Sequence, residues 1–136
     1  MHLLDTNVIS EIRKPSADTN VVAWFREQEP TALFLSALTM FELDLGVRKL
    51  ERRDSLQGAA LRRWLDGAVR QSFRGRVLAV DELVARRAAA LQVPDSRPDR
   101  DCFIAATALT HGLRVVTRNT RDFQHLEVEL VNPWDA

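Results

Sequence analysis

Short apolar runs alternate along the chain with longer segments in which apolar residues recur at helical spacing. The apolar runs predict five buried strands, at 2–5, 34–37, 76–80, 114–117 and 128–131. The segments between them predict helices at 18–29, 39–50, 54–74, 81–92 and about 101–111, the last of which ends before Gly112. This alternation predicts an α/β domain with a mostly parallel sheet of five strands, covered by helices on both faces.

Two of these helices carry a clear apolar stripe. In the helix at 39–50, the residues near the expected apolar face are Leu38, Phe41, Leu45 and Leu50. In the helix at 54–74, the positions that repeat at i, i+3, i+4, i+7 and i+8 are Leu61, Trp64, Leu65, Ala68 and Val69. We expect these residues to form the packed sides of the two helices.

The length and composition of the chain indicate a single domain. There are 136 residues, with no repeat, low-complexity tract or long linker, so we expect one domain over 1–136. No apolar run approaches the roughly 18 residues of a membrane span. The N-terminus lacks the pattern of a secretion signal, and the one cysteine, Cys102, cannot form an internal disulfide. We therefore expect a cytoplasmic protein without membrane association.

The charge of the chain is a weak guide to its partners. The formal net charge is zero, so there is no global basic field of the kind that attracts nucleic acid. Of the 19 basic residues, only Lys14 and Lys49 are lysines, which leaves 17 arginines. Arginine suits bidentate contacts with phosphate. A GC-rich genome produces the same enrichment, so composition is only a hint.

Acidic residues stand close to the ends of the first two predicted strands. Asp5 ends the first strand, and Glu42 lies one turn into the helix that follows the second. Ligands of parallel α/β sheets bind outside the carboxyl ends of the strands. Each acid also has a purely structural interpretation. Asp5, with Thr6 and Asn7 after it, is typical of a helix cap. Thr39 and Glu42 form the T-x-x-E pattern of a capping box.

Two further acids lie near later elements. Asp101 begins the alanine-rich helix, and Asp122 follows the fourth strand. Asp95 and Asp99, in the preceding loop, compete with Asp101, but loop carboxylates are usually solvated. The helix dipole is a sufficient reason for a carboxylate in a first turn. Asn119 and Asp122 fit an ordinary turn, so neither acid is decisive alone.

Together, the four carboxylates are expected at one edge of the sheet. Asp5, Glu42 and Asp122 follow the carboxyl ends of strands, and the helix of Asp101 must start at that edge. Repulsion within such a cluster would raise the pKa values of the acids unless a cation neutralised it. Oxygen ligands with few histidines indicate Mg²⁺ or Mn²⁺. Such an ion activates a bound water and stabilises charge on a phosphoryl oxygen, which favours phosphodiester hydrolysis.

Several stretches of the chain resemble PIN-domain ribonucleases, in particular the VapC/FitB-type toxins of bacterial toxin–antitoxin pairs. They are LLDTNVISEIRKP, LSALTMFELDLGV, DCFIAATALTHGLRVVTRNTRDF and LVNPW, so the resemblance spans nearly the whole chain. It implies a three-layer α/β/α fold and an Mg²⁺- or Mn²⁺-dependent endoribonuclease that cuts cellular RNA and inhibits translation or growth. It also implies a homodimer that a small antitoxin holds inactive, with DNA bound only through the antitoxin.

By position, the resemblance assigns catalytic and metal-binding roles to the same four acids. Asp5 and Asp101 are the expected main metal ligands, while Glu42 and Asp122 complete the shell or hold the attacking water. The polar companions expected to orient water or phosphate are Thr6, Asn7, Thr117 and Asn119. Arg100 departs from the family pattern, because relatives often carry an apolar residue there. An arginine at this position fits either RNA binding or pairing with the acids.

Four basic residues lie near the same edge in the sequence and are candidates for contacts with the RNA backbone: Arg13, Lys14, Arg118 and Arg121. For any one of them, a solvated surface charge is an equally good interpretation.

Two alternatives to a toxin stay open at this point. One is a PIN-domain nuclease that processes RNA and has no antitoxin. The other is a non-catalytic PIN-like module that binds RNA or protein. A response-regulator receiver domain also has an acidic pocket, but it needs a lysine after a late strand. This chain has no lysine after Lys49, so the receiver interpretation is weak.

Overall fold

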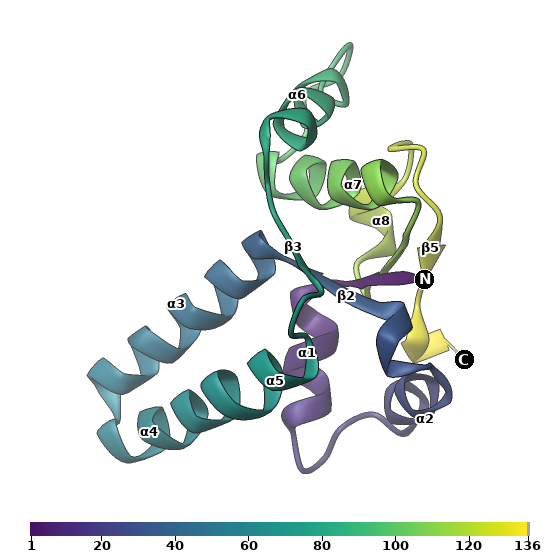
Figure 1. Cartoon of the computed structure of the whole chain (residues 1–136). Coiled ribbons are helices and arrows are strands. Elements are labelled where there is room, and N and C mark those ends of the chain that lie inside the picture. The colour runs from purple at the N-terminus through teal and green to yellow at the C-terminus, as the bar shows by residue number, and fades with distance from the viewer. Residues whose placement is uncertain (136) are drawn as a thin grey trace.

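A single parallel sheet lies at the centre of the molecule, with strand order β3-β2-β1-β4-β5 (Figure 1). The computed structural model describes residues 1–135. Its strands are β1 (His2–Leu4), β2 (Leu33–Ser36), β3 (Val77–Leu78), β4 (Arg114–Val116) and β5 (Leu130–Val131). The five predicted strands and their parallel arrangement are confirmed, although most of the strands are shorter than the apolar runs that predicted them.

Eight α-helices and three other helical segments are described in residues 1–135. The α-helices are α1 (Thr6–Arg13), α2 (Thr19–Glu27), α3 (Ala37–Arg53), α4 (Ser55–Arg63), α5 (Arg70–Ser72), α6 (Glu82–Ala90), α7 (Asp99–His111) and α8 (Thr120–Phe123). A π-helical segment, η2 (Trp64–Val69), joins α4 to α5, and two short 3-10 segments are η1 (Pro30–Ala32) and η3 (Pro133–Asp135). The predicted helix at 54–74 is thus one helical run of three parts. None of the helices described is long and apolar enough to cross a membrane.

Alternate residues of the strands point to opposite faces of the sheet and define two cores. Leu4 and Leu35 pack with side chains of α1, α2, α3 and η2 on one face. Leu3 and Val115 pack with α7 and α8 on the other. A third, smaller cluster joins α6 to the outer side of α7. The expected three-layer α/β/α architecture is therefore confirmed, with the helices of the two outer layers visible below and above the sheet in Figure 1.

The strand order reverses between β1 and β4. From β1 the chain moves to β2 and β3 on one side, whereas β4 and β5 lie on the other. β1 and β4 pair at this reversal, with Leu4 opposite Val116. Loops that leave adjacent strands in opposite directions open a ligand crevice at such a switch point. Asp5 and Thr117, the residues that follow β1 and β4, lie at this point.

The packed side of α3 differs from the prediction. Phe41 and Leu45 were expected on the packed side, but they are 60% and 39% exposed. The buried stripe of the helix consists instead of Thr39, Leu43 and Val47. With α4, α3 extends well beyond the sheet (Figure 1). Distance from the sheet does not explain this exposure, because Val47 lies further along α3 and is completely buried. Phe41 and Leu45 instead lie on the opposite side of the helix, since each is two residues, about 200° of rotation, from its neighbours in the buried stripe.

The α3–α4 pair depends on a close approach of two helix backbones. Gly58 of α4 is buried, and a Cβ atom placed on it would lie 2.4 Å from the Cα of Glu51 in α3. Nearby, Arg62 forms ion pairs with Asp44 at 2.5 Å and with Glu51 at 3.0 Å. The missing side chain at Gly58 is what lets the two helices meet at this distance.

We predict that Gly58→Ala lowers the free energy of unfolding by about 1–3 kcal/mol, because a backbone atom has to move to admit the methyl group. Gly46→Ala in α3 is the matched control, since a Cβ there has no neighbour within 4 Å. In a helix, that control is expected to be neutral or to stabilise by up to about 1 kcal/mol. Urea unfolding of the two variants measures the difference. Equal stabilities would show that the close approach is not what requires glycine at 58.

Candidate active site

Asp5 joins β1 to α1 and is completely buried. Its N–H donates to the carbonyl of Val116 at 2.9 Å, which ties the end of β1 to β4. One carboxylate oxygen, Oδ1, accepts the N–H of Thr6 at 2.8 Å and so caps α1. The other, Oδ2, accepts the hydroxyl of Thr117 at 2.8 Å. The helix-cap interpretation of Asp5 is therefore correct, and the same bonds fix its carboxylate at the switch point.

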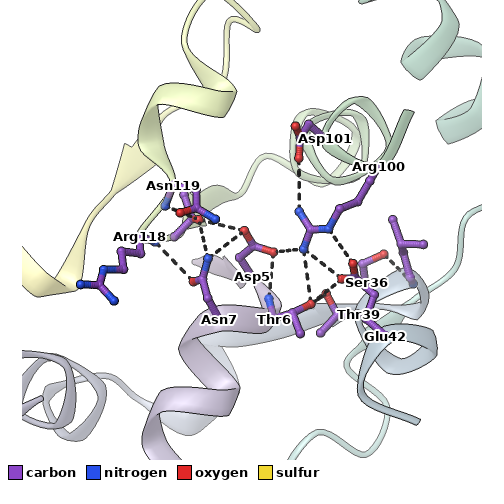
Figure 2. A network of polar contacts seen from close by, with 12 residues as sticks. Asp5, Thr6, Asn7, Ser36, Thr39, Glu42, Arg100, Asp101, Arg118 and Asn119 are labelled. Carbon is purple, nitrogen blue, oxygen red and sulfur yellow. Dashed lines mark hydrogen bonds and ion pairs between the residues drawn. The ribbon is translucent and has the colours of Figure 1, made fainter. Parts of the chain in front are cut away.

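Polar side chains from three segments surround this carboxylate (Figure 2). The side-chain amide of Asn7 donates to Thr117 Oγ1 at 3.2 Å and lies 3.5 Å from Asp5 Oδ2. The backbone N–H of Asn119 donates to the same Thr117 oxygen at 3.0 Å. The N–H of Arg118 donates to Asn7 Oδ1 at 3.3 Å. The loop after β4 is thus locked onto the start of α1.

Glu42 reaches the same place from α3. Its Oε1 accepts the hydroxyl of Thr6 at 2.6 Å. The capping-box interpretation of Glu42 is wrong, because α3 begins earlier than the T-x-x-E pattern suggests: Ser36 is the N-cap, and its Oγ accepts the N–H of Leu38 at 3.0 Å. Thr39 is buried within the helix. The carboxylate of Glu42 therefore does not cap α3, and it faces the end of β1.

Arg100, the second residue of α7, connects these acids (Figure 2). Its Nε and Nη2 donate to the two oxygens of Glu42 at 2.7 and 2.9 Å, a bidentate pair. Its Nη1 donates to Asp101 Oδ1 at 3.3 Å, and its Nη2 also donates to Asp5 Oδ1. Three of the four predicted acids thus surround one guanidinium. Of the two roles left open for Arg100, pairing with the acids is the one present in the structure.

Burial and charge act in opposite directions on these groups. Burial raises the pKa of Asp101, and the negative charges of Asp122 and Asp5 add to this, whereas Arg100 opposes it. Burial alone would raise the pKa of Glu42 as well, but hydrogen bonds from Arg100 and Thr6 lower it below its ordinary value. Burial acts to lower the pKa of Arg100, and its bonds to Glu42 and Asp5 reverse this and raise it. The guanidinium is therefore a permanent positive charge within an acidic cluster.

Asp122, the fourth acid, stands apart from this network. It is exposed in α8, and no hydrogen bond or ion pair of its side chain is described within residues 1–135. Its charge is nevertheless near enough to raise the pKa of Asp101. Asp99, one of the two competitors of Asp101, accepts a hydrogen bond from Gln92 at 2.6 Å instead. The structure thus favours Asp101 over Asp99 as the acid that α7 contributes.

The donor set fits a hard divalent cation in its chemistry. Within residues 1–135, no three His, Cys, Asp or Glu side chains lie at the spacing of a metal-binding group. The guanidinium of Arg100 lies among the carboxylates of Asp5, Glu42 and Asp101. These are all oxygen donors, and they already enclose one cation. Oxygen-only ligands are what Mg²⁺ and Mn²⁺ select, so the expected ligand set stays a prediction that the donor chemistry supports.

The basic candidates separate into two places. Arg118 lies beside Asn7 at the site, with its guanidinium carbon 5.3 Å from the ring centre of Trp134. Arg121 is exposed in α8, next to Asp122. Both therefore remain near the predicted edge.

Arg13 and Lys14 lie at the other end of α1. This helix has eight residues, so its far end is about 12 Å from Asp5. Arg13 lies over the ring of Trp64 at 5.7 Å, and Lys14 pairs with Glu11 at 3.2 Å. Their closeness to Asp5 in the sequence does not bring them close to it in space.

Fold and site together define a class of protein: a three-layer α/β domain with an acidic site at the switch point of a parallel sheet. The family model described as the PIN domain matches residues 2–129. The chain belongs to the PIN domain family.

Known proteins similar to this chain come from several bacteria. "VapC ribonuclease Y4jK" from Sinorhizobium fredii is 37% identical, with 99% of each chain covered. "Toxin FitB" from Neisseria gonorrhoeae is 38% identical over 98% of this chain and 99% of its own, and the crystal structure of FitAcB from the same species has a TM-score of 0.93 at 38% identity, with both chains fully covered. A toxin–antitoxin complex from Klebsiella pneumoniae has a TM-score of 0.70 at 25% identity over 98% of each chain. The similarity therefore extends over the whole domain.

The pKa of Glu42 leads to a prediction about stability and pH. Because its pKa is lowered in the folded protein, the ion pair with Arg100 stabilises the fold fully above the ordinary glutamate value of 4.5 and is lost as the pH falls through the lower folded value. In EDTA, Glu42→Gln is expected to lower the free energy of unfolding by about 1–3 kcal/mol at pH 7. The difference from wild type should shrink as the pH drops below 4.5.

Glu129→Gln is the control for this measurement. Glu129 pairs with Arg114 at 2.7 Å, but its side chain is 75% exposed, so its removal should change stability little at any pH. Chemical unfolding between pH 3.5 and pH 7 compares the three proteins. A Glu42→Gln effect that is the same at every pH would show that its charge does not stabilise the site.

Proposed function

We propose that this chain is a metal-dependent endoribonuclease and the toxin of a bacterial toxin–antitoxin pair. The observation that supports it best is the convergence of Asp5, Glu42 and Asp101 on one cationic group at the switch point of a PIN domain. The full-length relatives add to this, because one is named a ribonuclease and another a toxin. Paired carboxylates on a rigid sheet edge suit the hydrolysis of a phosphodiester.

The chain supplies an ordered set of oxygen atoms for this chemistry. A divalent ion held by Asp5 and Asp101 would stabilise charge on a phosphoryl oxygen and lower the pKa of a bound water. The residues then have separable tasks. Asp5 is immobilised by its bonds to Thr6 and Thr117 and so fixes the position of the site. Glu42, held by Thr6, is placed to accept a proton from the attacking water, and Asp122 would complete the acidic set from α8.

The substrate-binding surface extends from this cluster toward the loop after β4. Asn7, Thr117 and Asn119 present polar groups beside Asp5, and we assign them the positioning of water or phosphate. Arg118 and Arg121 are the basic side chains of this edge and would contact the RNA backbone. Arg13 and Lys14 lie at the far end of α1, so any contact they make would be with RNA well away from the reacting phosphate.

The partners follow from the same assignment. RNA is the substrate, and a small antitoxin would hold the nuclease inactive. The Klebsiella pneumoniae structure to which the chain is similar is that of a toxin–antitoxin complex, and this supports such a partner here. DNA would be bound only through the antitoxin. We place the protein in the cytoplasm, where its RNA substrate and its antitoxin are made.

Cleavage of RNA tests the function directly. Wild-type protein with Mg²⁺ or Mn²⁺ is expected to cut single-stranded RNA, and EDTA is expected to stop it. Asp5→Asn and Asp101→Asn should each lower the rate on the order of 10²-fold or more, because each removes a charged oxygen donor at the reacting centre. A gel-based assay with labelled RNA measures the rates.

Asp99→Asn is the matched control, since Asp99 lies two residues before Asp101 on α7 but bonds to Gln92. It is expected to cut RNA at the wild-type rate. If wild type, Asp5→Asn and Asp101→Asn all cut equally, a contaminating nuclease is responsible and the site is not the one described. If none of them cuts and all are folded, the chain is a non-catalytic binding module.

We also propose that the protein forms a homodimer through the exposed face of α3. Phe41 and Leu45 lie one turn apart on this helix and are 60% and 39% exposed, and contiguous apolar surface is what protein–protein interfaces cover. Phe41→Lys with Leu45→Lys is expected to convert a dimer into a monomer in analytical ultracentrifugation. Leu56→Lys is the control, because Leu56 is 82% exposed on α4. A dimer that survives the double change would place the interface elsewhere.

A further inference from the structure

Arg100 is the feature of the site that the proposed function leaves unexplained. Its guanidinium contacts Asp5, Glu42 and Asp101 at once. The proposed function assigns the cation to Asp5 and Asp101, and the attacking water to Glu42 beside them. Arg100 and a divalent metal ion would therefore compete for the same carboxylate oxygen atoms.

We propose that Arg100 is a displaceable counter-ion that becomes a phosphate-binding residue. In the metal-free protein it holds the carboxylates together. When a divalent cation takes their oxygens, the guanidinium turns outward and binds a phosphate of the RNA. The inference rests on the proposed ribonuclease function and adds to it a residue that links metal loading to substrate binding.

The charge balance of the cluster favours displacement. Asp5, Glu42 and Asp101 carry three negative charges, and Arg100 supplies one positive charge. The site thus keeps a surplus of two negative charges in a partly buried place, where charges are screened less than at the surface. A divalent cation in place of the guanidinium would leave a surplus of only one negative charge. It also brings two positive charges to a smaller volume than a guanidinium does.

The position of Arg100 favours its release. Its side chain is 32% exposed, whereas Asp5 beneath it is completely buried, so Arg100 lies on the solvent side of the cluster. Within residues 1–135, its side chain has hydrogen bonds to the three acids and one longer contact with Thr6 at 3.4 Å. Once the carboxylates bind something else, the long contact with Thr6 is the only one of these polar contacts left to the guanidinium.

The planar guanidinium of Arg100 has a geometry that suits a phosphate. Arg100 binds Glu42 through two parallel bonds of 2.7 and 2.9 Å, a fork that matches a phosphate as well as it matches a carboxylate. Because Arg100 precedes Asp101 on α7, an outward turn leaves it beside the acids. A phosphate bound there would lie next to the reacting centre.

Metal affinity provides the first test and does not depend on activity. Isothermal titration of the full-length protein with Mn²⁺ compares wild type, Arg100→Gln and Arg97→Gln. Arg97 lies three residues earlier, and no contact of its side chain with the three acids is described. Arg100→Gln is expected to bind Mn²⁺ about tenfold or more tightly, because the competitor for the oxygens is gone. Arg97→Gln should stay within about threefold of wild type, since a distant charge is screened.

Thermal unfolding and a second variant, Arg100→Lys, distinguish an effect on metal binding from a folding defect. Removal of Arg100 leaves the buried Asp5 without its cation, which is expected to lower the thermal stability of the metal-free protein. Addition of Mn²⁺ should restore more of the melting temperature in Arg100→Gln than in wild type, because the variant binds the ion more tightly. Arg100→Lys keeps the charge but not the fork, so it should fold and bind Mn²⁺ with an affinity between those of wild type and Arg100→Gln.

RNA supplies the second test. At saturating Mn²⁺, Arg100→Gln is expected to have a kcat/KM for RNA cleavage lower by about tenfold or more, with partial rescue by Arg100→Lys. Binding of a labelled single-stranded RNA in Ca²⁺ should show a salt dependence whose logarithmic slope is smaller by about 0.7, as for the loss of one phosphate contact. The combination of tighter metal binding with weaker RNA binding is the signature of a displaceable arginine.

Other outcomes overturn the proposal in distinct ways. Unchanged or weaker Mn²⁺ affinity in Arg100→Gln would mean that the arginine and the metal do not compete. Tighter Mn²⁺ binding with unchanged or faster cleavage would mean that Arg100 only inhibits. If wild type cuts no RNA, the proposed function fails on its own, and the Mn²⁺ affinity and the RNA-binding slope still decide the role of Arg100.

Discussion

The burial of a carboxylate at the centre of the sheet is the constraint around which this site is arranged. Asp5 follows the middle strand and has no exposed surface, and an ion removed from water is very costly unless hydrogen bonds and opposite charge compensate it. The compensation comes from the adjacent first turn of α1 and from two segments far apart in the sequence, the hydroxyl of Thr117 after β4 and Arg100 of α7. The bond to Thr117 joins the ends of β1 and β4, and the bond to Arg100 joins the sheet to the outer layer at α7. The acid that the chemistry requires is thus also a point at which the tertiary structure is fixed.

An acid that caps or begins a helix can also take part in the site. Asp5 caps α1 with one oxygen and still offers both oxygens to neighbours from other elements. Asp101 lies in the first turn of α7, where the helix dipole favours it, and it also bonds to Arg100. A residue placed at the start of a helix is held in a defined direction by the helix itself. Capping therefore provides the rigidity that a reactive carboxylate needs.

The sequence was informative where topology alone decides the position of a residue. The ends of parallel strands meet at one edge, so the positions of Asp5 and Thr117 followed from the apolar runs before them. It was misleading about which side of α3 faces the sheet: the spacing of Phe41 and Leu45 fits an apolar stripe, but the buried stripe is Thr39, Leu43 and Val47 on the opposite side of the helix. Spacing alone does not reveal which of two stripes is covered. Asp122 shows a similar limit, because its short helix places it outside the network.

For Arg100, the sequence indicated possible roles but not the contacts that the side chain makes. Its contacts reach across 58 residues to Glu42 and 95 residues to Asp5, and no local pattern specifies the direction of a long side chain over such separations. Its place beside Asp101 at the start of a helix did leave two roles open, and both use the same planar fork. An arginine that pairs with carboxylates in one state of the protein has the geometry to pair with a phosphate in another. A site that must exchange an internal cation for a metal and a substrate therefore favours arginine over lysine at this position, since the point charge of lysine fits neither partner in two bonds.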